Sequence, residues 1–260
     1  SSTPAIVSSY YRGDMERLGL RSLKDVLDFV PGVLVNANIN GSSPVQARGL
    51  SDVRNQKILF LLDGVPYWMP THGNFPLSGL PWKAIEKVEI IRGPGGVFYG
   101  TNASACVVKV TTSKSETSAV DSFVATNSRF GGSLYHGVDI KGDRYFSISA
   151  EYLRDGGYQA AVTDATNQLD FATLTFPRDL NTSLTRSESA KSLLLQFGGE
   201  HYSLTGHSYE SDTESGADGS AFSKRKGRRN GHLVHGELWG DVGGASYKIY
   251  TDVNRYYQAL

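Results

Sequence analysis

The stretch of sequence that decides the fold is residues 85–95, which read IEKVEIIRGPG. Val88 and Ile90 alternate with charged residues, and this two-residue period predicts a β-strand with one buried face. The glycine- and proline-rich run at 92–96 then ends the strand, because these residues interrupt a β ladder. The sequence therefore predicts a short amphipathic strand that runs into a tight loop.

The sequence on either side adds a helix and two more strands. Residues 22–30 place apolar side chains at helical spacing, with Ser22 as the N-cap and a Pro-Gly stop after the last turn. The apolar runs at 57–62 and 107–112 have the length of buried strands. This mixture predicts a small α+β domain in the first half of the chain.

Beyond this half the pattern changes to strand after strand. Segments of about ten residues match the length that crosses a bilayer as a tilted strand. We expect one domain at 1–114 and a second at 115–260, the second with about seven strands. The expected strands are 120–128, 133–141, 144–154, 189–198, 201–210, 230–240 and 245–257.

Strand 144–154 shows the alternation most clearly. Its apolar residues, Phe146 among them, share one face, and polar residues such as Ser149 share the other. The expected connections alternate between tight turns and the long polar loops 155–188 and 211–229, an arrangement typical of outer-membrane barrels. A soluble β-sandwich alternates in the same way, so this fold remains an alternative.

The composition and the motifs argue against several classes of function. Lys plus Arg and Asp plus Glu both number 26, so no overall positive charge indicates a nucleic-acid partner. The single cysteine excludes an internal disulfide, and no run of 18 apolar residues predicts a transmembrane helix. No charged-then-apolar leader occurs at residue 1, so any secretory signal is expected to have been removed. Without a Gly-x-Ser-x-Gly motif or metal-like ligand spacing, we expect no enzyme activity, catalytic residue, metal or cofactor.

Five elements of the first half, in order and covering about residues 10–114, resemble the plug domain of the TonB-dependent outer-membrane receptors. The stretch at 85–95 matches the signature of that family closely. The five elements are MERLG (15–19) with SLKDVL (22–27) and VPGV (30–33), QARG (46–49), LLDGVP (61–66), IEKVEIIRGPG (85–95) and YGTNA (99–103).

The resemblance implies an α+β plug domain followed by antiparallel strands of a transmembrane β-barrel of the 22-stranded type. Seven strands cannot close such a barrel, so the chain is expected to be part of a longer protein. The implied protein is a monomer of the bacterial outer membrane that contacts lipid, binds a ferric siderophore, cobalamin or haem, and imports it through TonB coupling. The alternatives are a soluble plug-like binding or regulatory module and a receptor that also signals to gene expression.

The resemblance places residues 67–75 on or near the ligand-facing side of the plug. Tyr67, Trp68, His72 and Asn74 are the expected ligand-binding residues, because aromatic rings and an amide suit a large, partly apolar chelate. The alternative is that the aromatic residues of this segment only pack against the barrel wall.

Three charged residues are expected to latch the plug to the barrel. Arg48 and Arg92 align with family arginines that pair with carboxylates of the barrel wall. Glu151, on the polar face of its strand, is an expected partner, since a buried arginine requires a counter-charge. The alternative is that both arginines lie on the solvated surface.

Two positions depart from the family pattern. Cys106 stands where a glycine is usual, and we expect it to pack as a small apolar residue. Lys109 stands where an asparagine is usual, and we expect it to need either a partner or an exposed face. The family's TonB box is not recognisable before Thr3.

Overall fold

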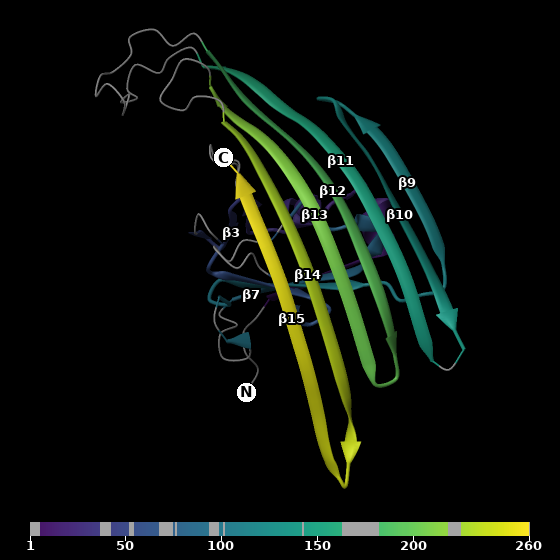
Figure 1. The fold of residues 1–260 in the computed structure, drawn as a ribbon. Helices are drawn as coiled ribbons and strands as arrows, with labels where there is room; N and C mark the ends of the chain where they lie inside the picture. The colour runs from purple at the N-terminus through teal and green to yellow at the C-terminus, as the bar shows by residue number, and fades with distance from the viewer. Residues whose placement is uncertain are drawn as a thin grey trace.

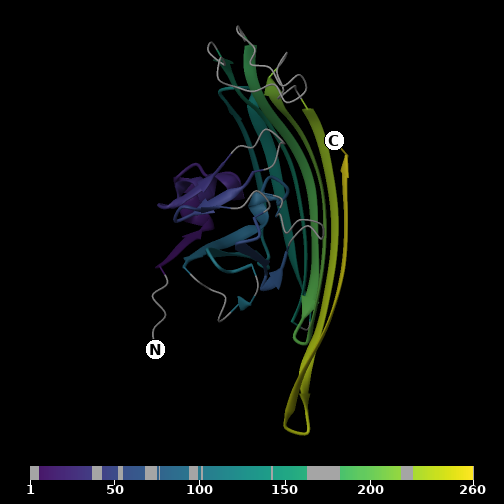
Figure 2. The ribbon, with the colours of Figure 1, turned by 90° about the vertical axis from the view of Figure 1, so that its left-hand side faces the viewer.

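Figure 1 shows the computed structural model of the chain, in which a small N-terminal domain lies beside a sheet of long strands. Seen after a turn of 90°, the sheet is curved and the N-terminal domain lies on its concave side (Figure 2). The residues that the structure describes are 6–36, 43–51, 55–67, 75, 77–93, 99–100, 102–141, 143–162, 182–217 and 225–259.

The N-terminal domain, which we define as β1 to β8, combines short helices with small sheets. One sheet has the strand order β1-β7-β8-β5-β6, in which β5 and β8 are parallel, and another has the order β2-β3-β4. Its elements are β1 (Ile6–Tyr11), α1 (Arg12–Arg17), α2 (Leu23–Phe29), β2 (Val33–Val35), β3 (Val45–Ala47), β4 (Leu50–Ser51), β5 (Ile58–Leu62), β6 (Val65–Pro66), the 3-10 helix η1 (Trp82–Ala84), β7 (Ile85–Arg92) and β8 (Cys106–Thr112).

The α2 helix forms where the sequence predicts it. Its N-cap, Ser22, accepts a hydrogen bond from the Asp25 backbone N–H at 3.1 Å, and the helix ends before Pro31. Leu23 and Leu27 lie four residues apart on one face, and both are fully buried in the core of the domain. The predicted apolar face is therefore the face that packs.

Strands β5, β7 and β8 confirm the three predicted strands of the first half. All five residues of β5 are buried. Cys106 is buried in the same core, and burial raises the pKa of its thiol to about 12, so it packs as an apolar side chain. Lys109 is partly exposed and its Nζ lies 3.7 Å from Glu89 Oε2, so it has both a partner and an exposed face.

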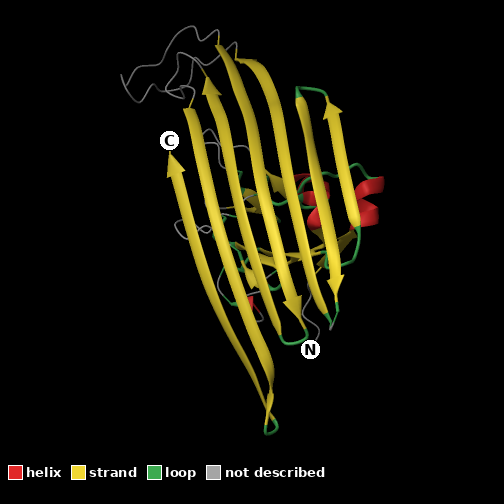
Figure 3. Cartoon of the chain, turned by 45° about the vertical axis from the view of Figure 1, so that its right-hand side comes forward, coloured by secondary structure: helices red, strands yellow, loops and turns green. Residues whose placement is uncertain are grey.

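The second half forms one antiparallel sheet in the order β9 to β15, which we call the wall sheet. Figure 3 shows its strands side by side, with tight turns at one end and a further short turn between β9 and β10 at the other. The predicted strands are confirmed in order, and a single sheet is not a β-sandwich. The strands are β9 (Ser118–Ala125), β10 (Arg129–Ile140), β11 (Arg144–Val162), β12 (Thr182–Gly199), β13 (Tyr202–Ala217), β14 (Arg225–Val242) and β15 (Ala245–Ala259).

Several wall strands are longer than the sequence predicts. β11 continues to Val162 and β12 begins at Thr182, both inside the expected loop 155–188. The residues added to β12, TSLTRSE (182–188), are mostly polar, and those added to β11, DGGYQAAV (155–162), begin with two glycines after Asp155 and hold few large apolar side chains, so no clear apolar alternation marks either extension as strand in the sequence. Strand ends are therefore under-predicted where neither face is apolar.

The two faces of the wall sheet differ in polarity, as the alternation predicts. Ser147, Ser149 and Glu151 are buried on the inner face, whereas Leu193 and Leu195 are 39% and 38% exposed on the outer face. Polar side chains inside and apolar side chains outside are the pattern of a membrane-spanning barrel strand. None of the helices that the structure describes is long and apolar enough to cross a membrane.

Candidate functional site

The N-terminal domain meets the wall sheet through polar clusters, the first of which surrounds Asp63. Asp63 and Gly64 both have positive φ, 50° and 87°, as suits a two-residue turn between β5 and β6. The Asp63 carboxylate accepts hydrogen bonds from the Thr112 backbone N–H (2.8 Å), the Thr112 hydroxyl (2.6 Å) and the Gln196 side-chain amide (2.9 Å). One carboxylate therefore ties the turn to β8 and to β12.

The second cluster holds η1 against β10 and β11. The Glu151 carboxylate accepts a hydrogen bond from the Trp82 backbone N–H at 2.8 Å, and the Ser133 hydroxyl oxygen accepts one from the Lys83 N–H at 3.3 Å. Both N–H groups belong to the first turn of a helix, where no intrahelical acceptor exists. Wall side chains thus complete the hydrogen bonding of η1, and the contact is buried.

The third cluster contains two ion pairs. The arginine belongs to the N-terminal domain in one pair and to the wall sheet in the other. Arg21 of the N-terminal domain pairs with Asp121 of β9, while Arg129 of β10 pairs with Asp25 of α2. Arg129 Nη2 lies 2.9 and 2.8 Å from the two oxygens of that carboxylate. The Phe123 ring lies near both guanidinium groups, with its centroid 5.2 and 5.7 Å from their Cζ atoms. Because these side chains are partly exposed, each pair contributes only modestly to docking.

Tyr67, a predicted ligand-binding residue, lies at the same interface. It is 3% exposed, its ring centroid lies 5.4 Å from that of His207 in β13, and its hydroxyl is hydrogen-bonded to His207 Nδ1. Burial raises the pKa of the Tyr67 hydroxyl well above its ordinary value. Trp68, His72 and Asn74 lie outside the described residues, so a ligand-binding role for these four residues stays a prediction.

Among the described residues, no ion pair or side-chain hydrogen bond joins the three residues of the predicted latch, although the Arg48 backbone N–H and the Arg92 side chain both contact the turn at 31–32. Arg92 donates hydrogen bonds to the Pro31 carbonyl oxygen and to Ser8 Oγ (2.9 Å), both within the N-terminal domain, and Arg48 is exposed. Glu151 does join the wall to the N-terminal domain, through a backbone N–H rather than through an arginine. The joint action of the three as a latch stays a prediction, and the ion pairs of the third cluster were not indicated by the sequence.

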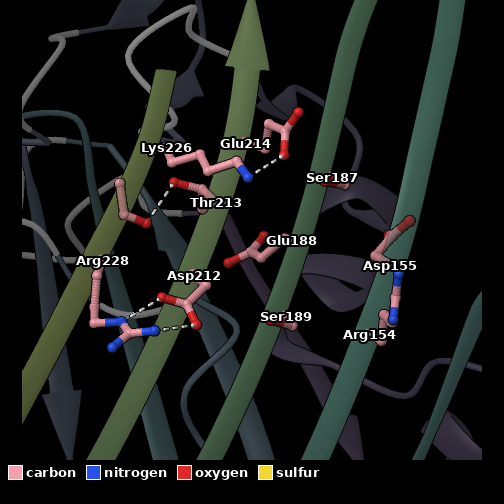
Figure 4. A pocket seen from close by; sticks show the side chains of 11 residues that line it. Arg154, Asp155, Ser187, Glu188, Ser189, Asp212, Thr213, Glu214, Lys226 and Arg228 are labelled. Carbon is pink, nitrogen blue, oxygen red and sulfur yellow. Dashed lines mark hydrogen bonds and ion pairs between the residues drawn. The ribbon is translucent and has the colours of Figure 1, made fainter. Parts of the chain in front are cut away.

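The outer face of the wall sheet carries a separate polar surface, a depression of about 530 Å³ lined by residues of β11 to β14. Figure 4 shows its ion pairs: Arg228 Nε lies 2.8 Å from Asp212 Oδ1, and Lys226 Nζ lies 3.8 Å from Glu214 Oε2. Thr213, between the two acidic residues, is buried on the inner face, so its neighbours in the strand point outward. These charges pair with one another and belong to the exterior.

The chemistry of the interface is that of reversible attachment. Its carboxylates, amides, hydroxyls and guanidinium groups can each exchange a protein partner for water at a small net change in free energy. Within the ranges that the structure describes, no group of three or more His, Cys, Asp or Glu side chains is arranged to hold a metal ion.

Residues 1–107 match the family described as the TonB-dependent receptor plug domain. Over 107 residues the chain is 38% identical to the vitamin B12 transporter BtuB of one Vibrio vulnificus strain, and over 112 residues it is 32% identical to BtuB of another. These matches cover 40% and 43% of this chain but only 17% and 18% of the two transporters. Both of these relatives are named as transporters.

Solved receptor structures match the fold over nearly the whole chain. A mutant of the ferric enterobactin receptor PfeA of Pseudomonas aeruginosa, in complex with enterobactin, matches with a TM-score of 0.63 and 16% identity, over 98% of this chain and 41% of the receptor. The copper transporter OprC matches with a TM-score of 0.58 and 15% identity, over 97% of this chain and 37% of the transporter. The chain therefore has the fold of these receptors and spans less than half of their length.

Proposed function

We propose that this chain is part of a TonB-dependent receptor of the bacterial outer membrane, of which it carries the plug domain and wall strands, and that it acts in the import of a scarce nutrient chelate. In this proposal the wall strands are part of a closed barrel that spans the lipid as a monomer, and TonB acts on the plug from the periplasmic side. We place the boundary between plug and barrel at residues 114 and 115, in the link between β8 and β9.

The observation that carries the proposal is the way the plug sits on the wall. Its core is apolar, but hydrogen bonds and ion pairs hold it to the inner face of the wall sheet. The opposite face of the same sheet exposes apolar side chains such as Leu195 and Ile249. A domain that blocks a pore and must also yield to a ligand needs contacts of this replaceable kind.

For the ligand we propose a bulky chelate of the cobalamin, ferric siderophore or haem class, with cobalamin as the first member to test. The support for cobalamin is the sequence identity to two vitamin B12 transporters, which lies in the plug. In this proposal the plug contributes part of the ligand-binding surface, including the segment that begins at Tyr67.

Uptake by cells tests the proposal. Radiolabelled cyanocobalamin and ferric enterobactin are supplied to the parent strain, to a strain that lacks the complete gene, to a strain without TonB, and to cells treated with a proton uncoupler. We expect uptake of one chelate in the parent strain and its loss in the other three. Uptake that survives deletion of TonB would overturn energy coupling.

Fractionation of the same cells distinguishes an outer-membrane receptor from a soluble binding module. We expect the protein in the outer membrane, as a band that changes mobility on boiling because a closed barrel resists detergent until heated. A soluble protein near 28.2 kDa, the mass of this chain, would instead support a soluble plug-like binding or regulatory module.

A further inference from the structure

A pocket of about 250 Å³ lies between the plug and the wall, toward the loop end of the wall strands. The plug side of the pocket comes from the start of α2 and from β2, and the wall side from β10, β11 and β12. Arg186, on its wall side, precedes Gln196 of the Asp63 cluster by ten residues of β12. Because a β-strand rises by about 3.3 Å per residue, the pocket lies about 30 Å farther along β12 toward the loops than the Asp63 cluster does.

The backbone fixes the position of Arg186. β11 has a bulge between Asp155 and Tyr158, and within it Gly157 has a φ of 65°. A Cβ at Gly157 would lie 1.7 Å from the Arg186 carbonyl oxygen, so only glycine lets the two strands approach this closely. The bulge thereby holds the start of the Arg186 side chain against the pocket.

The guanidinium group of Arg186 has an unused donor. Its Nη2 donates a hydrogen bond to Ser43 Oγ of the plug at 2.8 Å, while its Nη1 is buried and has no hydrogen-bond partner. None of the ion pairs among the described residues includes Arg186. A buried charged donor without an acceptor is costly, which points to an acceptor supplied from outside the chain.

The other charged side chains that line the pocket are already partnered. Lys24 and Arg129 each lie beside a carboxylate of α2, at 2.6 and 2.8 Å. Asp155 accepts a hydrogen bond from a backbone N–H two residues along the chain at 2.7 Å, and Glu188 accepts one from the Ser211 hydroxyl at 3.3 Å. Arg129 Nε is also buried without a hydrogen-bond partner, but the Arg129 guanidinium group lies within 4 Å of two carboxylates, 2.8 Å from Asp25 and 3.7 Å from Asp155, so Arg186 is the charge of this pocket that has no counter-charge among the described residues.

We propose that the pocket binds one oxyanion of the transported chelate, a carboxylate, phosphate or catecholate group, through Arg186. The proposal rests on the proposed import function, in which the ligand arrives from the loop side of the plug. A guanidinium group presents paired N–H donors in the plane that such oxygens favour, and the Ser43 hydroxyl and Asn36 amide are neutral neighbours. A volume of about 250 Å³ admits one such group rather than a whole chelate.

The first test measures ligand affinity. The complete receptor is purified in detergent as the wild type, as Arg186→Gln, and as Arg228→Gln, whose arginine lies on the outer face and serves as the matched control. Titration with cyanocobalamin, which carries a phosphodiester, and with ferric enterobactin, a catecholate chelate, gives Kd. We expect Arg186→Gln to weaken binding of the cognate chelate by about 10- to 100-fold, the usual effect of losing a charge-assisted hydrogen bond, and Arg228→Gln to leave it unchanged. The change of mobility on boiling confirms that each variant folds.

The second test separates this inference from the import function. Crystals of the wild type and of Arg186→Gln are soaked in tungstate, an oxyanion that anomalous diffraction locates. We expect a tungstate peak beside the Arg186 guanidinium group in the wild type alone, even if neither chelate binds, in which case the choice of chelate fails and the anion pocket stands. The absence of a wild-type peak, a peak that persists in Arg186→Gln, or an unchanged Kd for a bound chelate would each overturn the proposal.

Discussion

Leu23 and Leu27 in the plug core are buried among apolar side chains, whereas Glu151 and Gln196 are buried where the plug meets the wall. Few apolar side chains of the wall sheet pack into the apolar core of the plug. Among the described residues, those that join the apolar core of the plug are Tyr135, Leu194 and Leu233, with Ala119 packed against it. Apolar contacts thus hold the plug core together, whereas mainly polar contacts attach the plug to the wall.

The difference shows how a plug can leave its wall and remain folded. Separating apolar surfaces costs about 25 cal/mol for each Å² exposed to water. Separating hydrogen-bonded groups costs only about 1 kcal/mol for each bond, because water replaces the lost partner. A pull that exceeds the attachment can therefore release the plug well before it unfolds it, which suits the proposed transport.

The largest expected effect comes from a cavity inside the plug. Leu27→Ala removes a fully buried side chain, and we expect it to lower the free energy of unfolding of the plug by about 2–5 kcal/mol. Hydrogen exchange of the β5 and β8 amides measures this loss. Leu18→Ala, at a half-exposed position, is the matched control and should change exchange by no more than about 0.5 kcal/mol.

A weaker effect is expected where η1 docks on the wall. Glu151→Ala leaves the Trp82 backbone N–H without its acceptor, and we expect docking of the plug to weaken by about 1–3 kcal/mol. Exchange of the Trp82 amide should then accelerate while exchange of the Val108 amide in the plug core stays unchanged. Glu151→Gln retains an acceptor oxygen and is the control; equal acceleration at both amides would contradict the division between core and interface.

A charge exchange tests the attachment more finely. Arg21→Asp places two carboxylates together at Asp121, and we expect it to weaken docking by about 0.5–1 kcal/mol, since the pair is partly exposed. The double variant Arg21→Asp with Asp121→Arg restores opposite charges and should recover most of the loss. Protease sensitivity of the plug–wall link follows docking in all three proteins, and a double variant no better than the single one would exclude a direct pair.

The smallest expected effect is a dependence of plug stability on pH. The hydrogen bond from Lys87, and then the charge of Lys109, hold the pKa of Glu89 below its ordinary value of 4.5 against the opposing effect of burial. A carboxylate with a lowered folded-state pKa stabilises the fold above the unfolded-state pKa, and this stability is lost as the pH falls through the folded-state value. We expect urea unfolding to show a loss of stability below about pH 4.5 that is smaller in Glu89→Gln. An identical pH profile in the variant would remove Glu89 as its cause.

The contacts between plug and wall show where sequence reasoning ends. The sequence placed Glu151 on the polar face of an alternating strand, and the resemblance offered it as a partner of the latch arginines, whereas in the structure it accepts a hydrogen bond from the Trp82 backbone N–H. The sequence did not indicate Arg21 and Asp121, which lie a hundred residues apart and carry no local pattern that marks them as partners. Register alone brings them together, since pairing of β9 with β10 places Asp121 opposite Ser133 on the inner face.

The sequence by itself determined the main helix and three strands of the first half, the seven wall strands and the polarity of the wall faces, but not the short elements β1, α1, β2 to β4, β6 and η1. Helix α2, strands β5, β7 and β8, and the order of the wall strands follow from periods of 3.6 and 2 residues, which reflect burial within each element. Only the tertiary structure decided the partners of Arg92 and Tyr67, the extension of β11 and β12 beyond their apolar parts, and the unpartnered donor of Arg186. The physical reason is that burial of an apolar face leaves a local repeat in the sequence, whereas a polar contact depends on the distance between two segments that only folding sets.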